Sequence, residues 1–249
     1  MESNITPELQ EKIKQLQTII DNGRRIVFFG GAGVSTESGI PDFRSADGLY
    51  HQKYKYNPET ILSHSFFMQK TEEFYEFYRD KMVVTDVKPN ITHLFLAKLE
   101  EAGKLSGVVT QNIDGLHQAG GSKKVIELHG SIHRNYCMKC KAFHPLSDMT
   151  GEEPIPRCAC GGILKPDVVL YEEGLKDQDV DTALSLISNA DVLIVGGTSL
   201  SVYPAASFIR YFQGEHLVLI NKSSTPYDAN ADLLIQAGLG EVFSRLTIA

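Results

Sequence analysis

The sequence predicts an α/β protein built on a doubly wound parallel sheet, for two reasons. Short apolar runs that suit buried strands alternate along the chain with longer segments of helical periodicity. Most of these runs end in Gly, Ser, Thr, Asn or His, residue types that suit ligand-binding loops at the carboxyl edge of an open sheet. We therefore expect a ligand site along one edge of the sheet.

The composition is that of one large globular domain, or of a large domain with a small insertion. The chain has 249 residues, of which 42% are hydrophobic and 22% charged, and its formal net charge is −7. This charge gives no reason to expect nucleic-acid binding, and it is compatible with a cationic partner such as a lysine-rich protein tail. No apolar run approaches the roughly 20 residues that span a bilayer, and the first ten residues do not resemble a signal peptide. We expect a cytoplasmic protein without a membrane segment.

The first predicted elements are a helix and a buried strand. The helix begins at Thr6 and Pro7, continues through apolar residues at helical spacing to Ile20, and stops at Gly23. The strand is the apolar run 26–29, which leads directly into a turn rich in glycine.

This turn, at residues 30–33, suits the binding of a phosphate. Its glycines let the backbone approach the anion closely, and we expect a helix that starts at Ser35 or Thr36 to aim its amides at it. Thr36 replaces the third glycine of the common G-x-G-x-x-G pattern, so the turn alone is a weak signal. Residues 39–44 add a stiff turn, an acid, an aromatic ring and a cation, and they make the motif specific.

The next segments are aromatic and helical. Tyrosines and phenylalanines crowd residues 50–78, where they could line a substrate channel, although a small helical layer packed by its aromatic side chains is favoured. A further helix is predicted over 92–102, with a stop at Gly103.

Polar residues gather at the ends of the next two predicted strands. Asn112 and Asp114 follow the strand 107–109, and His129 follows the strand 125–128. A lone histidine at a strand end is more often structural, but its place at the same sheet edge as the two other polar residues favours a functional role. The remaining predicted elements are an extended run at 165–171, helices at 179–189 and 204–212, and strands at 192–195, 217–220 and 233–235.

All four cysteines lie close together, as Cys137-x-x-Cys140 and Cys158-x-Cys160. This clustering predicts a tetrahedral zinc site; the alternatives are disulfides, which reducing compartments disfavour, and free thiols. Four thiolates leave no open coordination position, so the metal should stabilise the fold and take no part in catalysis. Ribbons of this kind can bind nucleic acid, but the acidic residues inside this one argue against that role.

Together, these motifs resemble those of the sirtuins of bacterial type, the NAD-dependent protein deacylases. From Gly31 the chain reads Gly-Ala-Gly-x-Ser-x-x-Ser-Gly-Ile-Pro-Asp-Phe-Arg, which is similar to the family signature. The resemblance covers about residues 15–243, and the other motifs follow in the family's order: 110–114, His129-Gly130, the four cysteines, 165–171, 197–200 and Ile220-Asn221.

The resemblance implies two domains. A Rossmann-like NAD-binding domain would comprise residues 1–44, 82–131 and 165–249, and a smaller domain would consist of a helical insertion at 45–81 and a zinc ribbon at 132–164. The acyl-lysine of a protein or peptide substrate would enter the cleft between them. We expect NAD as co-substrate, one structural zinc ion per chain, no nucleic-acid or membrane partner, and a monomer.

The same likeness implies the residues of the NAD site. Phe43 would cover the reactive face of the ribose, and Ile113 and Asp114 would hold the nicotinamide carboxamide. The full set of cofactor-binding residues is Ala32, Thr36, Phe43, Arg44, Gln111, Asn112, Ile113, Asp114, His129, Thr198, Ser199, Asn221 and Val242.

The implied reaction transfers the acetyl group from lysine to ADP-ribose and releases nicotinamide. Because the amide oxygen of acetyl-lysine is a weak nucleophile, positioning must supply much of the rate. The catalytic candidates are Asn112 and His129, and His129 is the expected general base because an imidazole titrates near neutral pH. The substrate-binding candidates, which would pair with the peptide as strands, are Val169, Tyr171, Leu200 and Val202.

Three departures from the family pattern affect these expectations. The second cysteine pair is one residue shorter than usual, and Tyr171-Glu172-Glu173 stands in place of Phe-Gly-Glu at the peptide cleft. Relatives that prefer acidic acyl groups have a Tyr-x-x-Arg in the acyl channel, but no arginine occurs here between Arg44 and Arg79. We therefore expect acetyl or longer neutral acyl groups as substrates.

Three other functions are compatible with parts of the pattern. A mono-ADP-ribosyltransferase would use the same NAD pocket. A Rossmann dehydrogenase usually has an acid about 20 residues after the glycine turn, and residues 51–58 offer none. A non-catalytic zinc-ribbon module would not require Asn112, Asp114 and His129 at one sheet edge.

Overall fold

The computed structural model describes residues 5–42, 48 and 55–248, and it contains a six-stranded sheet and a separate three-stranded sheet. The helices are α1 (Pro7–Asn22), α2 (Pro58–Ile61), α3 (His64–Gln69), α4 (Thr71–Phe77), α5 (Ile91–Glu101), α6 (Leu116–Ala119), α7 (Asp177–Asn189) and α8 (Leu239–Phe243). The strands are β1 (Ile26–Gly30), β2 (Leu105–Thr110), β3 (Val125–Glu127), β4 (Gly130–Cys137), β5 (Phe143–His144), β6 (Leu164–Val168), β7 (Val192–Gly196), β8 (His216–Ile220) and β9 (Leu233–Ile235). None of the described helices is long and apolar enough to cross a membrane.

The large sheet has the order β3-β2-β1-β7-β8-β9, and all of its strands are parallel. From β1 the chain winds to β2 and β3 on one side, and later from β7 to β8 and β9 on the other. The point at which the winding reverses therefore lies between β1 and β7, whose ends pair as Gly30 with Gly196. A reversal of this kind opens a crevice at the carboxyl edge of the sheet.

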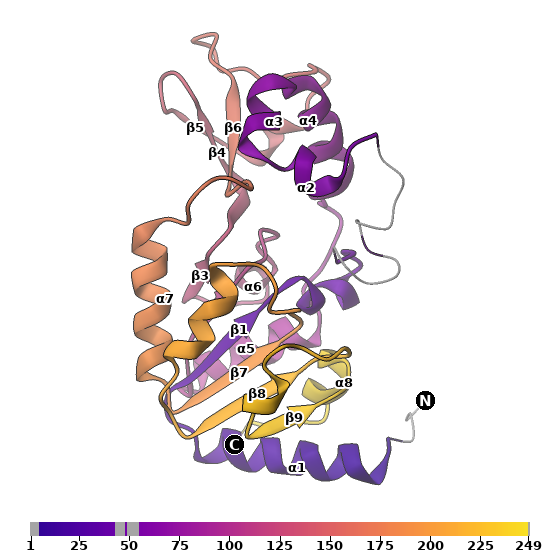
Figure 1. Ribbon diagram of the computed structural model, residues 1–249, viewed down its shortest axis with the longest axis vertical. Coiled ribbons are helices and arrows are strands. Elements are labelled where there is room, and N and C mark those ends of the chain that lie inside the picture. Colours follow the sequence, from indigo (N-terminus) through magenta and orange to yellow (C-terminus); the bar gives the residue numbers. More distant parts are fainter. Residues whose placement is uncertain (1–4, 43–47, 49–54, 249) are drawn as a thin grey trace.

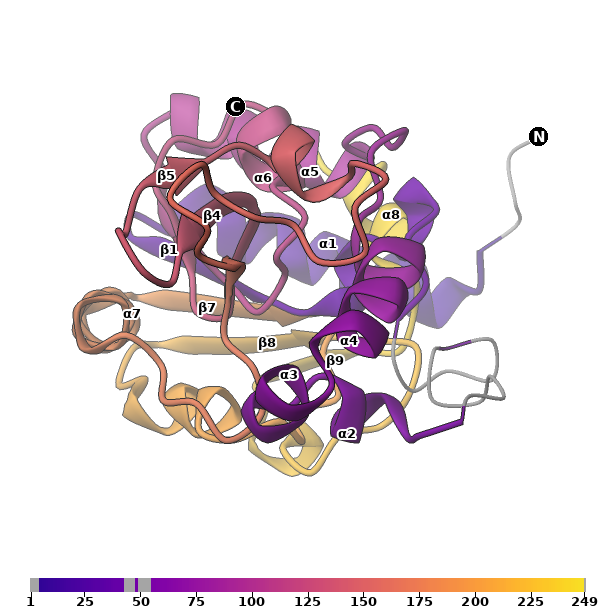
Figure 2. The same cartoon turned by 90° about the horizontal axis from the view of Figure 1, so that it is seen from above.

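Helices cover both faces of this sheet, which confirms the doubly wound fold (Figure 2). Residues of α1, α5 and α8 pack with side chains from one face, among them Leu16, Leu96 and Phe243. The other face packs against α7 and against the 3-10 helix Ala205–Tyr211. The predicted first helix is confirmed, because the Thr6 side chain accepts a hydrogen bond from the Leu9 amide (3.2 Å) at its start.

The small antiparallel sheet, ordered β5-β4-β6, lies with α2, α3 and α4 at one end of the molecule (Figure 1). The two parts share one hydrophobic cluster, in which Phe67 and Phe74 from the helices meet Ile132 and Leu164 from the strands. The Tyr75 hydroxyl donates a hydrogen bond to the Leu164 carbonyl. The aromatic side chains of residues 66–78 therefore pack as the predicted helical layer. The tyrosines at 50 and 54 lie outside the described residues.

Two predicted helices are present only in 3-10 form. No α-helix starts at Ser35 or Thr36; residues 31–42 instead contain the 3-10 turns Ala32–Val34 and Thr36–Ser38. The turn ends before an α-helix can form, because the Gly39 amide donates to the Thr36 carbonyl (3.0 Å) and Gly39 has a left-handed φ of 93°.

The helix expected at 204–212 is present, as a 3-10 helix at Ala205–Tyr211. There the Ser207 amide and hydroxyl both donate to the Pro204 carbonyl (2.9 and 2.6 Å). A serine side chain that competes for a backbone carbonyl in this way favours the tighter turn over an α-helix.

Candidate active site

A cavity of about 760 Å³ lies at the carboxyl edge of the large sheet. The loops after β1, β2, β3, β7 and β8 form part of its wall, and residues 168–173 after β6 form another part. The predicted site residues that line it are Ala32, Thr36, Gln111, Asn112, Ile113, Asp114, His129, Val169, Tyr171, Thr198, Ser199, Val202 and Asn221.

Two of the described residues that were predicted for this site do not line the cavity. Val242 is fully buried in the core beneath α8, and Leu200 is buried in the core on the other face of the sheet. Phe43 and Arg44 lie outside the described residues, so their predicted roles remain predictions.

The loops after β1 and β7 touch each other through their backbones. The Gly33 amide donates to the Gly197 carbonyl (2.8 Å), and a Cβ at Gly33 would lie only 2.8 Å from the Gly197 Cα. Any side chain at Gly33 would therefore separate the two loops. Gly197 itself has a φ of 63°, which glycine adopts without strain. These glycines bring the backbones of the two loops together at the wall of the cavity.

Ser35 joins the loop after β1 to the loop after β2. Its hydroxyl donates to an Asp114 carboxylate oxygen (2.6 Å) and accepts from the Asn112 side-chain amide (3.1 Å). The other Asp114 oxygen accepts from the Leu116 amide (2.9 Å). The two predicted polar residues are thus held in fixed positions. From the sequence, Ser35 is expected only to start a helix. Its role in holding Asn112 and Asp114 is visible only in the structure, although its place inside the glycine-rich motif is a signal for such a role.

Gln111 connects the loop after β2 to the loop after β7. Its side-chain oxygen accepts from the Thr198 hydroxyl (3.1 Å). Asn221, after β8, fixes the same loop, because it accepts from the Thr198 amide (3.1 Å) and donates to the Thr198 carbonyl (2.9 Å). The Gln111 Nε2 is buried and has no hydrogen-bond partner among the described residues. A buried donor without a partner at a cavity wall suits a polar ligand.

His129 follows β3 with its ring at the cavity. Its Nδ1 lies 3.0 Å from the Gln111 carbonyl, and since a carbonyl only accepts, Nδ1 carries the hydrogen in neutral histidine. Nε2 is then the basic nitrogen. Burial lowers the pKa of His129, and the hydrogen bond to Gln111 partly opposes this shift. The imidazole is therefore neutral at pH 7 and can accept a proton.

The small sheet carries a metal site. The Sγ atoms of all four cysteines lie within 4.8 Å of one another, with Cys137 and Cys160 at 3.4 Å and Cys140 and Cys158 at 3.7 Å. Four thiolates at about 2.3 Å from a tetrahedral zinc would be about 3.8 Å apart, so the group fits zinc. None of the four forms a disulfide. The shorter spacing of Cys158 and Cys160 therefore does not prevent the four thiols from surrounding one metal ion.

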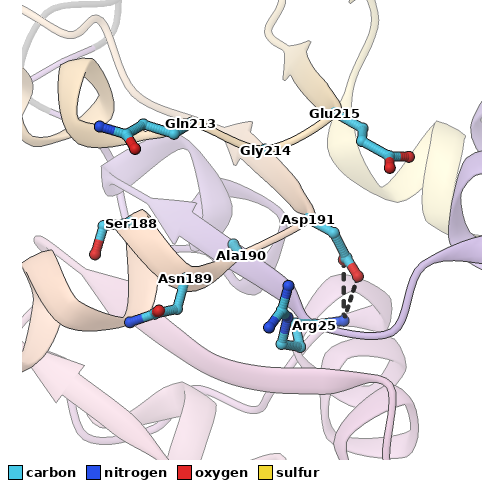
Figure 3. A pocket seen from close by; sticks show the side chains of 8 residues that line it. All are labelled: Arg25, Ser188, Asn189, Ala190, Asp191, Gln213, Gly214 and Glu215. Atoms are coloured by element: carbon cyan, nitrogen blue, oxygen red, sulfur yellow. Dashed lines mark hydrogen bonds between the residues drawn. The ribbon is translucent and has the colours of Figure 1, made fainter.

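A second hollow, of about 400 Å³, lies at the opposite edge of the large sheet (Figure 3). It is bordered by the end of α7 and the segments before β7 and β8, and the Asp191 carboxylate in its wall accepts from the Arg25 amide (2.9 Å). This contact ties the start of β1 to the start of β7. None of the predicted site residues that the structure describes lines this hollow.

The cavity at the reversal point of the sheet and the separate metal site define a Rossmann-type dinucleotide-binding protein with a metal-ribbon insertion. The sequence pattern of the Sir2 family matches residues 31–204. The chain belongs to the Sir2 family.

Individual relatives agree with this assignment. The chain is 60% identical over 242 residues to an NAD-dependent protein deacetylase of Clostridium acetobutylicum, covering 96% of this chain and 99% of that relative. It is 45% identical over 237 residues to an NAD-dependent protein deacetylase of Staphylococcus epidermidis, covering 94% and 96%.

Solved Sir2 structures are also similar to this chain. A Sir2 complex with p53 peptide and NAD+ has a TM-score of 0.83 at 38% identity, covering 94% of this chain and 96% of that one. A Sir2 variant with deacetylated p53 peptide and 3′-O-acetyl ADP ribose has a TM-score of 0.85 at 38% identity and the same coverage.

Proposed function

We propose that this protein is an NAD-dependent protein-lysine deacetylase, which transfers the acetyl group from lysine to ADP-ribose and releases nicotinamide. The observation that carries the proposal is the convergence of Asn112, Asp114 and His129 on one cavity, which residues 169–173 after β6 also line. Relatives that share 45–60% of their residues with this chain are named NAD-dependent protein deacetylases.

The residues of the cavity fit NAD. The backbones after β1 and β7 would face the phosphates, with Ala32 and Thr36 beside them, and Thr198, Ser199 and Asn221 would contact the adenosine end. Gln111 supplies a buried amide nitrogen that has no partner in the described part of the chain. When bound, NAD supplies an electrophilic ribose carbon and nicotinamide as a leaving group.

Asn112 and Asp114 would orient the nicotinamide side of the co-substrate. The Asp114 carboxylate is already held by Ser35 and by the Leu116 amide, so it needs little rearrangement to accept from a carboxamide. Ile113, which packs against the hydrophobic cluster of the small sheet, would close the same pocket against water.

His129 would remove a proton from a ribose hydroxyl. Its Nδ1 donates to the Gln111 carbonyl, which fixes the ring and leaves Nε2 as the proton acceptor. Because burial lowers the pKa of His129, the basic form is present at neutral pH and below it.

The substrate peptide would lie beside residues 169–171 on one side and residues 200–202 on the other. The Val169 amide donates to the His129 carbonyl (3.0 Å), so the peptide edge and the general base are joined directly. We propose acetyl and longer neutral acyl groups as substrates. Arg79, the nearest arginine after the predicted acyl channel, does not line the cavity. Its guanidinium donates instead to the Met149 and Glu153 carbonyls (2.8 and 2.6 Å), so it is not placed to bind an acidic acyl group.

The four cysteines would hold one zinc ion that stabilises the small sheet. We propose the domain limits expected above, with residues 45–81 and 132–164 as the smaller domain, because side chains from α2–α4 and from β4 and β6 share one cluster. We further propose a cytoplasmic monomer that binds no nucleic acid, in keeping with its net charge of −7.

The transferase alternative uses the same pocket, and only the products separate the two reactions. Incubation with NAD and an acetyl-lysine peptide, followed by mass spectrometry, tests the proposal. We expect loss of one acetyl group from the peptide and formation of nicotinamide and acetylated ADP-ribose. Addition of ADP-ribose to protein, with the acetyl group intact, would refute it.

A further inference from the structure

Glu172, in the wall of the cavity, has a backbone conformation that residues with side chains rarely adopt. Its φ is 75°, in the left-handed region, whereas glycine would take this conformation without strain. A non-glycine residue is held there only when other contacts compensate for the strain.

The compensating contacts come from the first turn of α3. One carboxylate oxygen of Glu172 accepts from the Ser65 amide and the other from the Ser65 hydroxyl, each at 2.9 Å. The Glu172 carboxylate, which the sequence places beside the peptide path, thus points at α3. There it accepts from the Ser65 amide, which has no partner within its own helix.

The residues on either side of Glu172 are attached to the same segment. The Tyr171 amide donates to the Leu62 carbonyl and its carbonyl accepts from the His64 amide, both at 2.9 Å. The Glu173 carboxylate lies 2.8 Å from His64 Nδ1. Three consecutive residues of the cavity wall therefore bind the chain segment that leads into α3.

We propose that Glu172 is a positioning residue that fixes the peptide-binding edge of the cavity through Ser65. This inference rests on the proposed deacetylase function, because it assigns the edge to the substrate peptide. An edge that is ordered in advance binds a peptide with less loss of conformational freedom. Since its carboxylate is paired with Ser65, Glu172 affects all acetyl peptides alike, whatever the charge of their flanking residues.

Steady-state kinetics of Glu172→Gly and Glu172→Gln tests the proposal. Glycine keeps the left-handed backbone but removes both contacts, and we expect the peptide KM to rise about three- to tenfold. The kcat and the KM for NAD should stay within about twofold. Glutamine retains an oxygen for the Ser65 amide and should restore most of the affinity. Glu76→Gln, which removes a charge from the exposed side of α4, is the matched control.

A second variant tests the path through Ser65. Ser65→Ala removes only the hydroxyl contact, so it should raise the peptide KM less than Glu172→Gly does. The double variant should equal Glu172→Gly, because that change alone already removes both contacts. Additive effects would contradict the proposal. So would an unchanged KM in Glu172→Gly, or a loss confined to lysine-rich peptides and equal in Glu172→Gln, which would indicate simple charge attraction.

Hydrogen exchange separates this inference from the proposed function. Amides of residues 62–66 and 170–173 should exchange faster in Glu172→Gly than in the unsubstituted protein, and unchanged rates would overturn the proposal. If the unsubstituted protein removes no acetyl group, the proposed function fails, and these exchange rates still decide whether Glu172 fixes the edge.

Discussion

Acid should destabilise this protein through two buried histidines behind the active site. His93 in α5 and His117 in α6 are both buried, with their ring centroids 4.7 Å apart. The Asn90 amide donates to His93 Nδ1 (3.2 Å), but His93 Nε2 and both nitrogens of His117 have no partner among the described residues. Burial lowers the pKa of His93 to about 4, partly opposed by Asp114. Burial and the neighbouring His93 lower the pKa of His117 to about 3.

The sign of the effect follows from these shifts. A lowered folded-state pKa means that the unfolded chain binds the protons first, so stability is fully present above about pH 6.5 and falls as the pH falls below it. Between about pH 7.5 and pH 5.5, each histidine lowers the free energy of unfolding by about 1.4 kcal/mol, and the pair by about 2.7 kcal/mol.

Urea unfolding at the two pH values measures this loss. The variant His117→Leu removes one titrating group, so its loss should be smaller by about 1.4 kcal/mol. His216→Gln, at the start of β8, removes an imidazole outside the pair and should behave like the unsubstituted protein. An equal loss in His117→Leu and the unsubstituted protein would refute the reasoning.

Three further predictions concern catalysis and stability. His129→Ala should reduce deacetylation at least about 100-fold in an acetyl-peptide assay while some nicotinamide exchange remains, and a wild-type rate would exclude His129 as the base. Because burial lowers the pKa of His129, kcat/KM should stay level as the pH falls to about 6.5 and decline only below it; a decline that begins above pH 7 would contradict this. Arg134→Met should lower the free energy of unfolding by about 1–2 kcal/mol in urea titrations, because Arg134 bonds the buried Glu127 (2.5 Å) and Asp167 (2.9 Å), and no change would mean that this ion pair contributes nothing.

The sheet and the site were largely predictable because their signals are local. Apolar runs that end in polar residues place strands and their loops, and parallel pairing then brings Asn112, Asp114 and His129 to one edge. The cysteine cluster was predictable for the same reason, since ligand spacing is written in the sequence.

The remaining differences concern the type of two helical segments and the contacts of one acid. The helix expected at Ser35 or Thr36 ends after one 3-10 turn, because Gly39 takes a left-handed φ of 93° and Pro41 follows it. Gly39 and Pro41 are local stop signals, and they outweigh the cap residues at 35 and 36. The contact of Glu172 is a different case, because its partner is distant in sequence. The sequence places an acid at 172 beside the peptide path, but only the structure shows that its carboxylate accepts hydrogen bonds from Ser65.

The most direct test of the proposed function is the product analysis of one reaction. Purified protein, NAD and an acetyl-lysine peptide would be combined, and the peptide and nucleotide products would be identified by mass spectrometry. We expect the peptide to lose one acetyl group while nicotinamide and acetylated ADP-ribose appear in equal amounts. Consumption of NAD with the acetyl group left on the peptide, or no consumption of NAD with any acyl peptide, would contradict the assignment.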